Sequence, residues 1–276
     1  MIHNILKDRS TKLFIVLSGF FIANALIAEI IGVKIFSLEQ TLGFEPLQIK
    51  VLGEVLSLNL TAGVLLWPVV FIMTDIINEY YGTRGVRFLS YLTAALIAFA
   101  FLIFYGAMAL KPAGFFVTGK VNAGIPDMEK AYEGVLGQGG WIIVGSLTAF
   151  LLGQIIDVLV FHKIKKITGE NKIWLRSTGS TLVSQFIDSF VVLFIAFYIG
   201  TRVGAAPGDF VWSFKLFLAV GIVNYLYKTI VAIILTPVIY WVHGIIERYL
   251  GHELAAEMKA AAMAQKGIPS DVPVAG

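Results

Sequence analysis

The residues of this chain that are best suited to bind a solute are carboxylates, amides and a lysine that interrupt long apolar stretches. A charged side chain near the middle of a bilayer costs on the order of 3 kcal/mol, so such residues are expected to face the interior of a helix bundle and to have polar partners. Together they predict a polar internal cavity that binds a small molecule. The candidate substrate-binding residues are Asp75, Asn78, Glu79, Gln154, Asp157, Gln185, Asp188, Asn224 and Lys228.

Three of these candidates follow one another closely in the segment 74–79. Asp75, Asn78 and Glu79 are spaced i, i+3 and i+4, so a helix places them on one face. Two interpretations of this face stay open. The three side chains line the cavity, or they form the hydrated cytoplasmic end of a span.

A Gln-x-x-Asp pattern occurs in two different apolar stretches, as Gln154 with Asp157 and as Gln185 with Asp188. Such amides either contact the solute or join neighbouring helices through hydrogen bonds worth about 1 kcal/mol each. Lys228 also lies near mid-membrane. It is expected to form an ion pair with Asp188 or Asp157, to contact the solute, or to do both.

Nothing in the sequence indicates catalysis, and we expect no catalytic residue, no metal site and no cofactor. The chain contains no cysteine, which excludes thiolate chemistry and disulfides. His3, His162, His243 and His252 lie at or beyond the ends of apolar stretches, without the paired spacing of a zinc protease. The net charge of +3 is too small to indicate a nucleic-acid partner.

The elements that must position these residues are membrane-spanning helices. The chain is 58% hydrophobic and only 14% charged, whereas roughly a quarter of the residues of a globular domain are charged. A helix needs about 20 apolar residues to cross about 30 Å of hydrocarbon, and these stretches lack the alternation of barrel strands. We therefore expect an all-α integral membrane protein with six transmembrane helices. The expected spans are residues 13–36, 55–81, 88–110, 141–161, 178–200 and 213–243.

Several local features refine this arrangement. The Trp67-Pro68 and Thr236-Pro237 steps are expected to kink their helices. In the long loop 111–140, a short helix is expected just after Pro126. The segment after residue 250 is expected to form an Ala-rich helix that is followed by a disordered Pro/Gly end. Glu29 and Lys34 are assigned to the membrane interface.

The distribution of basic residues predicts the orientation. Thirteen lysines and arginines, among them Lys7, Lys165, Lys172, Arg176 and Lys266, fall on the face that carries both termini, and seven fall on the opposite face. By the positive-inside rule, both termini are cytoplasmic. The chain then divides into a cytoplasmic N-terminus (1–12), a six-span transporter domain (13–245) and a cytoplasmic C-terminal tail (246–276).

Ordered motifs along residues 12–245 resemble the queuosine precursor transporter family, also called the vitamin uptake transporter family. These motifs are the segment 74–82, the segments 149–157 and 160–161, Trp174-Leu175-Arg176 with Ser180-Thr181, Gln185-x-x-Asp188-Ser189, Tyr227-Lys228 and Thr236-Pro237. The loop 37–54 and the tail after about residue 250 are the parts that resemble the family least.

The resemblance implies import of 7-deazaguanine precursors, such as 7-cyano-7-deazaguanine, across the bacterial inner membrane for queuosine synthesis in tRNA. It also implies a six-helix bundle resembling the substrate-binding subunits of energy-coupling-factor transporters. One alternative stays open, a binding subunit for another nucleobase or vitamin that depends on a separate ATPase. A homodimer and an energising partner both remain open.

A deazaguanine presents hydrogen-bond donors on one edge, a carbonyl acceptor and a flat face. A carboxylate can accept from the donor edge, an amide or ammonium can donate to the carbonyl, and an aromatic ring can stack on the face. The residues expected in these three roles are Asp188 or Asp75 for the donor edge, Asn78, Gln154, Gln185 or Lys228 for the carbonyl and ring nitrogens, and Phe186 or a neighbouring aromatic residue for stacking.

Overall fold

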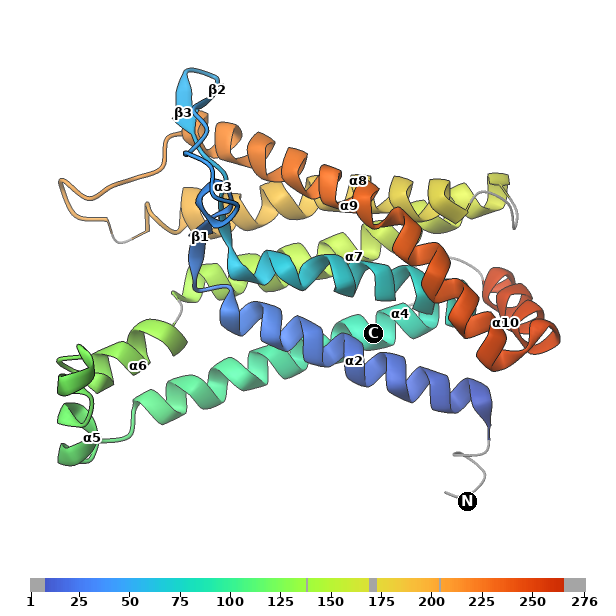
Figure 1. Cartoon of the computed structure of the whole chain (residues 1–276), viewed down its shortest axis with the longest axis horizontal. Coiled ribbons are helices and arrows are strands. Elements are labelled where there is room, and N and C mark those ends of the chain that lie inside the picture. The colour runs from blue at the N-terminus through green and yellow to red at the C-terminus, as the bar shows by residue number, and fades with distance from the viewer. Residues whose placement is uncertain (1–7, 138, 169–172, 204, 266–276) are drawn as a thin grey trace, which may run out of the picture.

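The computed structural model describes residues 8–137, 139–168, 173–203 and 205–265 as a bundle of long helices (Figure 1). Five helical segments of the described residues are long and apolar enough to cross a membrane. They are Arg9–Ile31, Trp67–Met108, Met128–Thr168, Trp174–Ile199 and Phe214–Leu250. The expectation of a mostly helical protein with several membrane-spanning helices is confirmed. These candidate spans number five among the described residues, and not the expected six, because the second and third expected spans belong to one helix.

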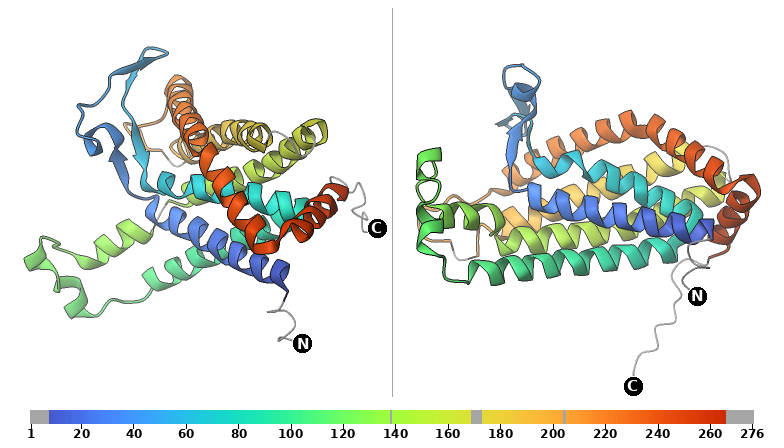
Figure 2. Two further views of the ribbon diagram at one scale, coloured as in Figure 1. Left: turned by 45° about the vertical axis from the view of Figure 1, so that its right-hand side comes forward. Right: turned by 60° about the horizontal axis from the view of Figure 1, so that its bottom comes forward.

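That helix, α4 (Trp67–Met108), breaks at Gly82, where φ is 71° and ψ is −172°, a conformation essentially restricted to glycine. The chain reverses there, so that residues 67–81 and 83–108 form a first and a second arm running in opposite directions (Figures 1 and 2). The Gln265 side chain bridges the break. Its Nε2 donates to the Tyr81 carbonyl at 3.0 Å, and its Oε1 accepts from the Arg84 amide at 3.2 Å.

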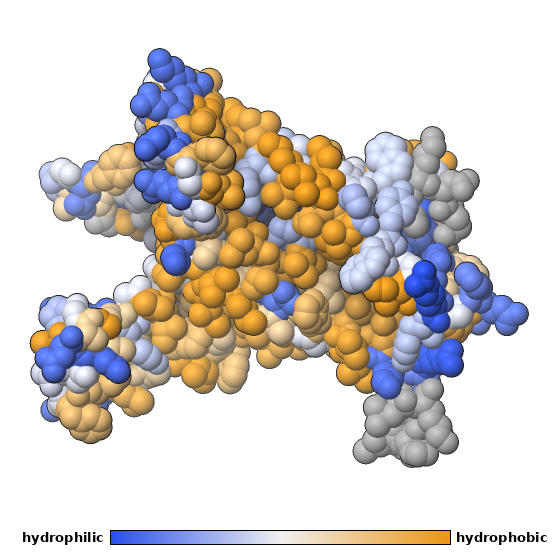
Figure 3. Space-filling model, in the orientation of Figure 1, coloured by the Kyte–Doolittle hydropathy of each residue, from blue (hydrophilic) through white to orange (hydrophobic). Residues whose placement is uncertain are grey.

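The remaining long helices pack around α4. They are α2 (Arg9–Ile31), α7 (Gly140–Thr168), α8 (Ile173–Leu193) with a π-helical continuation at Phe194–Ile199, α9 (Phe214–Leu250) and α10 (His252–Ala264). Helix α7 packs most extensively against α8, while α2 lies against α4 and α9 lies against α8. Figure 3 shows an apolar belt across the middle of one face, with hydrophilic side chains gathered at both ends. This distribution fits a bundle that crosses a bilayer.

An apolar core joins α2, both arms of α4 and α7. Phe21 of α2, Val70 of the first arm, Leu89 of the second arm and Phe150 of α7 are among its members, and each is at most 3% exposed. Burial of large side chains from four segments holds the two arms in place against α2 and α7.

Helix α2 begins with a side-chain cap. The Asp8 carboxylate accepts hydrogen bonds from the Thr11 hydroxyl and from the Thr11 amide at 2.9 Å, which satisfies donors at the helix start. These bonds and those from Ser10 favour the charged form, so the pKa of Asp8 falls to about 2. The start of α2 and the whole of α10 lie at the same end of the bundle (Figures 1 and 2).

At the other end, the loop between α2 and α4 folds into two short antiparallel ribbons. Strands β1 (Ile35–Ser37) and β4 (Asn59–Thr61) pair with each other, as do β2 (Ile49–Val51) and β3 (Glu54–Leu56), and the remaining turns are α3 (Leu38–Thr41) and the 3-10 turn Ala62–Leu65. The expected start of a span at residue 55 is therefore wrong. The expected kink at Trp67-Pro68 is also wrong, because Pro68 lies in the first turn of α4, where proline needs no amide partner.

Glu39 holds this loop together. Its buried carboxylate accepts from the backbone amides of Leu58 at 2.7 Å and Leu47 at 3.3 Å and from the Ser37 hydroxyl at 3.1 Å. Burial acts to raise the pKa of Glu39, but these hydrogen bonds outweigh it and leave the pKa below its ordinary value.

Two expected short helices are confirmed. Helix α6 (Met128–Leu136) starts after Pro126 with Asp127 as its cap, and α10 is the Ala-rich helix after residue 250. Helix α5 (Gly114–Thr118) and a 3-10 turn at Val121–Ala123 precede α6. Pro237 lies inside α9. The expected disordered end falls outside the described residues, as do His3, Lys7, Lys172 and Lys266.

Candidate functional site

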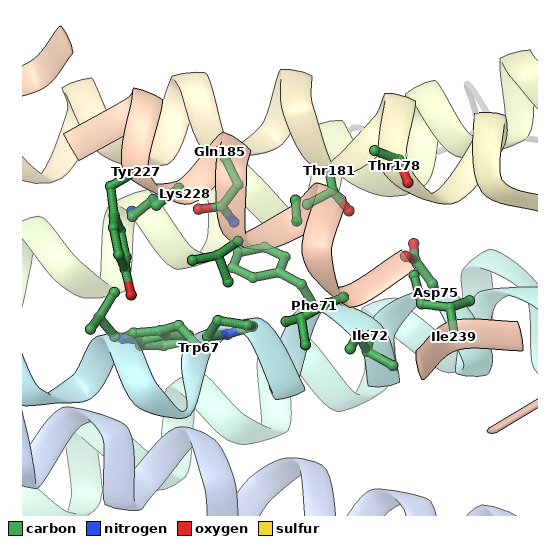
Figure 4. A pocket seen from close by; sticks show the side chains of 15 residues that line it. Trp67, Phe71, Ile72, Asp75, Thr178, Thr181, Gln185, Tyr227, Lys228 and Ile239 are labelled. Carbon is green, nitrogen blue, oxygen red and sulfur yellow. The ribbon is translucent and has the colours of Figure 1, made fainter. Parts of the chain in front are cut away.

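A cleft lies between the first arm of α4, α8 and α9 (Figure 4). About 40 Å³ of it is open to the centre of a water molecule, within about 510 Å³ of space between atoms that includes open solvent. Most of its wall is apolar, and a few polar side chains interrupt it. The polar and aromatic residues of the wall are Asp75, Thr178, Thr181, Gln185, Lys228, Trp67, Phe71 and Tyr227. A mostly apolar wall with a few placed polar groups is the usual composition of a small-molecule site.

Two polar groups in this wall lack partners among the described residues. Asp75 is 1% exposed, and its Oδ2 accepts from the Ser177 hydroxyl while its Oδ1 has no hydrogen-bond partner. Gln185 is 4% exposed, and its Nε2 has no partner either. Figure 4 shows Asp75 at one end of the cleft and Gln185 further along it. A buried acceptor and a buried donor are thus available to a bound molecule.

Aromatic rings flank the end of the cleft near Gln185. Trp67 and Phe71 come from the first arm of α4, and Tyr227 comes from α9 (Figure 4). The sequence did not assign these three rings to the binding site, because aromatic residues are common in membrane-spanning helices. Their signal is positional, since Trp67 and Phe71 are spaced i, i+4 and Phe71 precedes Asp75 by one turn.

Lys228 lies in the same wall and forms an ion pair with Asp188. This is one of the two pairings expected from the sequence, and it is confirmed. The side chains of Lys228 and Asp188 are 15% and 19% exposed, so the pair is only partly desolvated. Asp188 itself is not part of the wall.

Glu79 lies away from the cleft in a buried ionic cluster. Its Oε1 is 2.7 Å from an Arg176 guanidinium nitrogen, and its Oε2 is 3.0 Å from Lys165 Nζ. All three side chains are at most 1% exposed. Sequence reasoning placed Lys165 and Arg176 among the cations of the cytoplasmic face, whereas the structure buries both against Glu79.

Three further candidates are buried off the cleft wall. Gln154 Oε1 accepts from the Thr74 hydroxyl at 3.0 Å and from the Ser90 hydroxyl at 3.4 Å, which joins α7 to both arms of α4. Asp157 accepts from the Ser184 hydroxyl at 3.1 Å. Asn78 is 1% exposed, and neither side-chain atom has a partner among the described residues. The hydrated-end interpretation of Asp75, Asn78 and Glu79 does not match this burial.

Asn224 and Phe186 are the candidates that the structure does not bring to the cleft or to these buried groups. Asn224 is partly exposed on α9. Phe186 is 47% exposed and packs against Phe190 and Tyr225. Glu29 is 7% exposed and accepts from the Ser146 hydroxyl of α7, so it faces the bundle, while its assignment to the depth of the membrane interface stays a prediction. Its helical neighbours Ala25 and Ala28 are also buried, which draws Glu29 into the bundle.

The helices long and apolar enough to span a membrane, the apolar belt and the cleft together indicate a multi-pass membrane protein with a cleft inside its helix bundle. The family described as "Putative vitamin uptake transporter" matches residues 61–242. The chain belongs to this family of membrane transporters, as the motifs around Asp75, Asp157 and Asp188 indicated.

Individual relatives carry names related to queuosine. The chain is 30% identical, over 195 residues, to a "Probable queuosine precursor transporter" of Bacillus subtilis (strain 168), an alignment that covers 70% of this chain and 76% of the relative. It is 25% identical, over 186 residues, to the "Queuosine precursor transporter" of Escherichia coli (strain K12), with 66% of this chain and 71% of the relative covered. No solved structure matched.

Proposed function

We propose that this chain imports a queuosine precursor, a 7-deazaguanine base, across the bacterial cytoplasmic membrane, and that the cleft between α4, α8 and α9 binds the base. The observation that carries the proposal is that one cleft wall, mostly aromatic and apolar, contains two polar atoms without partners. They are a carboxylate oxygen of Asp75 and the amide nitrogen of Gln185. The names of the relatives supply the class of substrate.

The chemistry of the base matches these groups. The donor edge of a deazaguanine suits Asp75, since a carboxylate accepts two N–H bonds at once. Gln185 Nε2 can donate to the ring carbonyl, and Trp67, Phe71 and Tyr227 provide faces for stacking. Glu79, Gln154 and Asp188 are then supports, because each already has a side-chain partner.

The proposed topology has six spans with both termini in the cytoplasm. The two arms of α4 count as separate spans, since each begins or ends at the Gly82 reversal and runs in the opposite direction to the other. The start of α2 and helix α10 lie at one end of the bundle, where most of the lysine and arginine residues of the sequence were assigned.

Uptake of labelled 7-cyano-7-deazaguanine in cells that cannot synthesise the base tests this proposal. Asp75→Asn removes the charged acceptor, and Gln185→Leu removes the amide. A hydrogen bond to a charged group contributes about 1.5–3 kcal/mol, so Asp75→Asn should weaken apparent affinity by about 10- to 150-fold. The control is Asp127→Asn, because asparagine caps α6 as well as aspartate does.

Normal uptake by Asp75→Asn and Gln185→Leu would contradict the placement of the site. Competition of unlabelled deazaguanines, guanine and vitamins against the labelled base defines the substrate. If a vitamin competes and the unlabelled deazaguanines do not, the vitamin alternative replaces the queuosine proposal. Uptake that appears only when an ATPase co-purifies would identify the chain as a binding subunit.

A further inference from the structure

Two buried carboxyl groups in the described part of the bundle form no ion pair. Asp75 of α4 and Asp157 of α7 are 1% and 0% exposed, and among the described residues neither forms an ion pair. Each accepts a serine hydroxyl with one oxygen, Asp75 from Ser177 and Asp157 from Ser184, and each leaves the other oxygen without a hydrogen-bond partner. Both serines lie on α8, so one helix connects the two acids.

The charged groups around this pair are engaged elsewhere. The charges that act on Asp75 are those of Asp157, Glu79 and Arg176. Arg176 lies on α8 and pairs with Glu79, which also holds Lys165. From α9, Lys228 reaches the same cleft as Asp75 and pairs with Asp188.

Two buried carboxylates on facing helices are costly to keep ionised together, because burial disfavours each charge and their repulsion adds to that cost. Hydrogen bonding leads to the same conclusion. Asn78 shares the helical face of Asp75, and its amide is unpartnered. The unpartnered oxygens of Asp75 and Asp157 are both acceptors while the carboxyls are ionised, and a proton on one carboxyl turns that group into a donor.

We propose that Asp75 and Asp157 together form the proton-binding site that couples import of the base to the proton gradient. The inference rests on the proposed function, since Asp75 is also the acceptor for the base. When the donor edge of the base binds the Asp75 carboxylate, the proton is held on Asp157, and the cleft closes over one negative charge instead of two. Opening to the cytoplasm hydrates Asp157, which releases the proton together with the base.

The empty carrier then returns without its proton and needs another positive charge near the two acids. Lys228 is the cation that lines the same cleft. Its pairing with Asp188 in this structure corresponds to the proton-bearing state, in which Asp75 and Asp157 need no cation.

The test uses the purified full chain in liposomes, with the pH dye pyranine inside and labelled 7-cyano-7-deazaguanine outside. Exchange of the base between equal pools, without a gradient, first reports the proposed function by itself. An inside-alkaline gradient of one pH unit should then drive accumulation of up to about tenfold for one proton per base, and addition of the base should acidify the lumen.

Asp157→Asn keeps the size of the side chain and removes the titratable group. We expect its gradient-driven accumulation to fall to about onefold and its base-induced acidification to disappear, while exchange falls by less than about threefold. Asp157→Glu, which restores a carboxyl, should regain accumulation with an altered pH profile. Asp127→Asn in the loop before α6 should behave like the unmodified protein in all three measurements.

Each outcome has a distinct meaning. Exchange without accumulation or proton influx in the unmodified protein overturns the coupling inference and leaves the proposed function standing. Full accumulation by Asp157→Asn also overturns it. Loss of exchange in Asp157→Asn with accumulation absent in Asp157→Glu assigns Asp157 to folding or binding and contradicts the inference. Absence of exchange in the unmodified protein refutes the proposed function, and the coupling inference with it.

Discussion

The buried ionic cluster around Glu79 makes a sharp prediction about stability. Both oxygens of Glu79 face a cation, Arg176 at 2.7 Å and Lys165 at 3.0 Å, and all three side chains are at most 1% exposed. Glu79→Gln removes the negative charge that both cations face and leaves a neutral amide against them in a dry site. Removing one partner of a buried ion pair costs about 3–5 kcal/mol, a large part of the about 5–15 kcal/mol that holds a typical protein folded.

A companion variant separates charge balance from simple loss of contact. Lys165→Met leaves Glu79 paired with Arg176, so its cost should be that of one hydrogen bond to a charged group, about 1.5–3 kcal/mol. Denaturant titration of the purified variants in one detergent measures the free energy of unfolding of each variant. The control is Glu133→Gln, an exposed acid on α6.

The expected order of destabilisation is Glu79→Gln, then Lys165→Met, then Glu133→Gln. If Glu79→Gln stays within about 1 kcal/mol of the unmodified protein, the argument that the Glu79 charge stabilises this buried cluster is refuted.

Three further predictions concern other parts of the chain. Gly82→Ala should destabilise the protein by about 1–3 kcal/mol, because alanine is strained at φ 71° and its Cβ would meet the Gln265 amide, whereas Gly106→Ala on the same helix has free space and should be neutral in the same unfolding assay. The carboxyl of Asp8 should titrate near pH 2 by NMR, because hydrogen bonds lower its pKa. The stabilisation of α2 by this cap is then complete above pH 3.8, the ordinary pKa of aspartate, and is lost as the pH falls through about 2. Lys228→Met should cost less stability than Glu79→Gln, since the Lys228–Asp188 pair is partly exposed, and an equal cost would contradict that ranking.

The sequence predicted the helical membrane class and the burial of most candidate polar residues, because both depend on local apolarity and on the cost of charge in lipid. It did not predict which polar groups meet. Asp75 and Glu79 are one turn apart on α4, yet one faces the cleft and the other faces Lys165 and Arg176. That difference depends on how α7 and α8 are rotated against α4. The spacing of residues along one helix does not predict this rotation.

Two structural errors in the sequence prediction concern the loop that precedes α4. The apolar stretch from residue 55 looked like helix, but three-residue strands in a loop are too short to produce a periodic signal. Pro68 was taken for a kink because proline within an apolar stretch suggests one, while its actual place in the first turn depends on where the ribbon β1–β4 ends.

The contact between Gln265 and the Gly82 reversal has a consequence for biosynthesis. Translation delivers Gly82 to the membrane more than 180 residues before Gln265, the residue whose amide supports both sides of the reversal. Until Gln265 emerges, the Tyr81 carbonyl and the Arg84 amide lack this support. The paired arms therefore reach their final state only after Gln265 has left the ribosome, and a stop codon placed before Gln265 would leave the reversal without this contact.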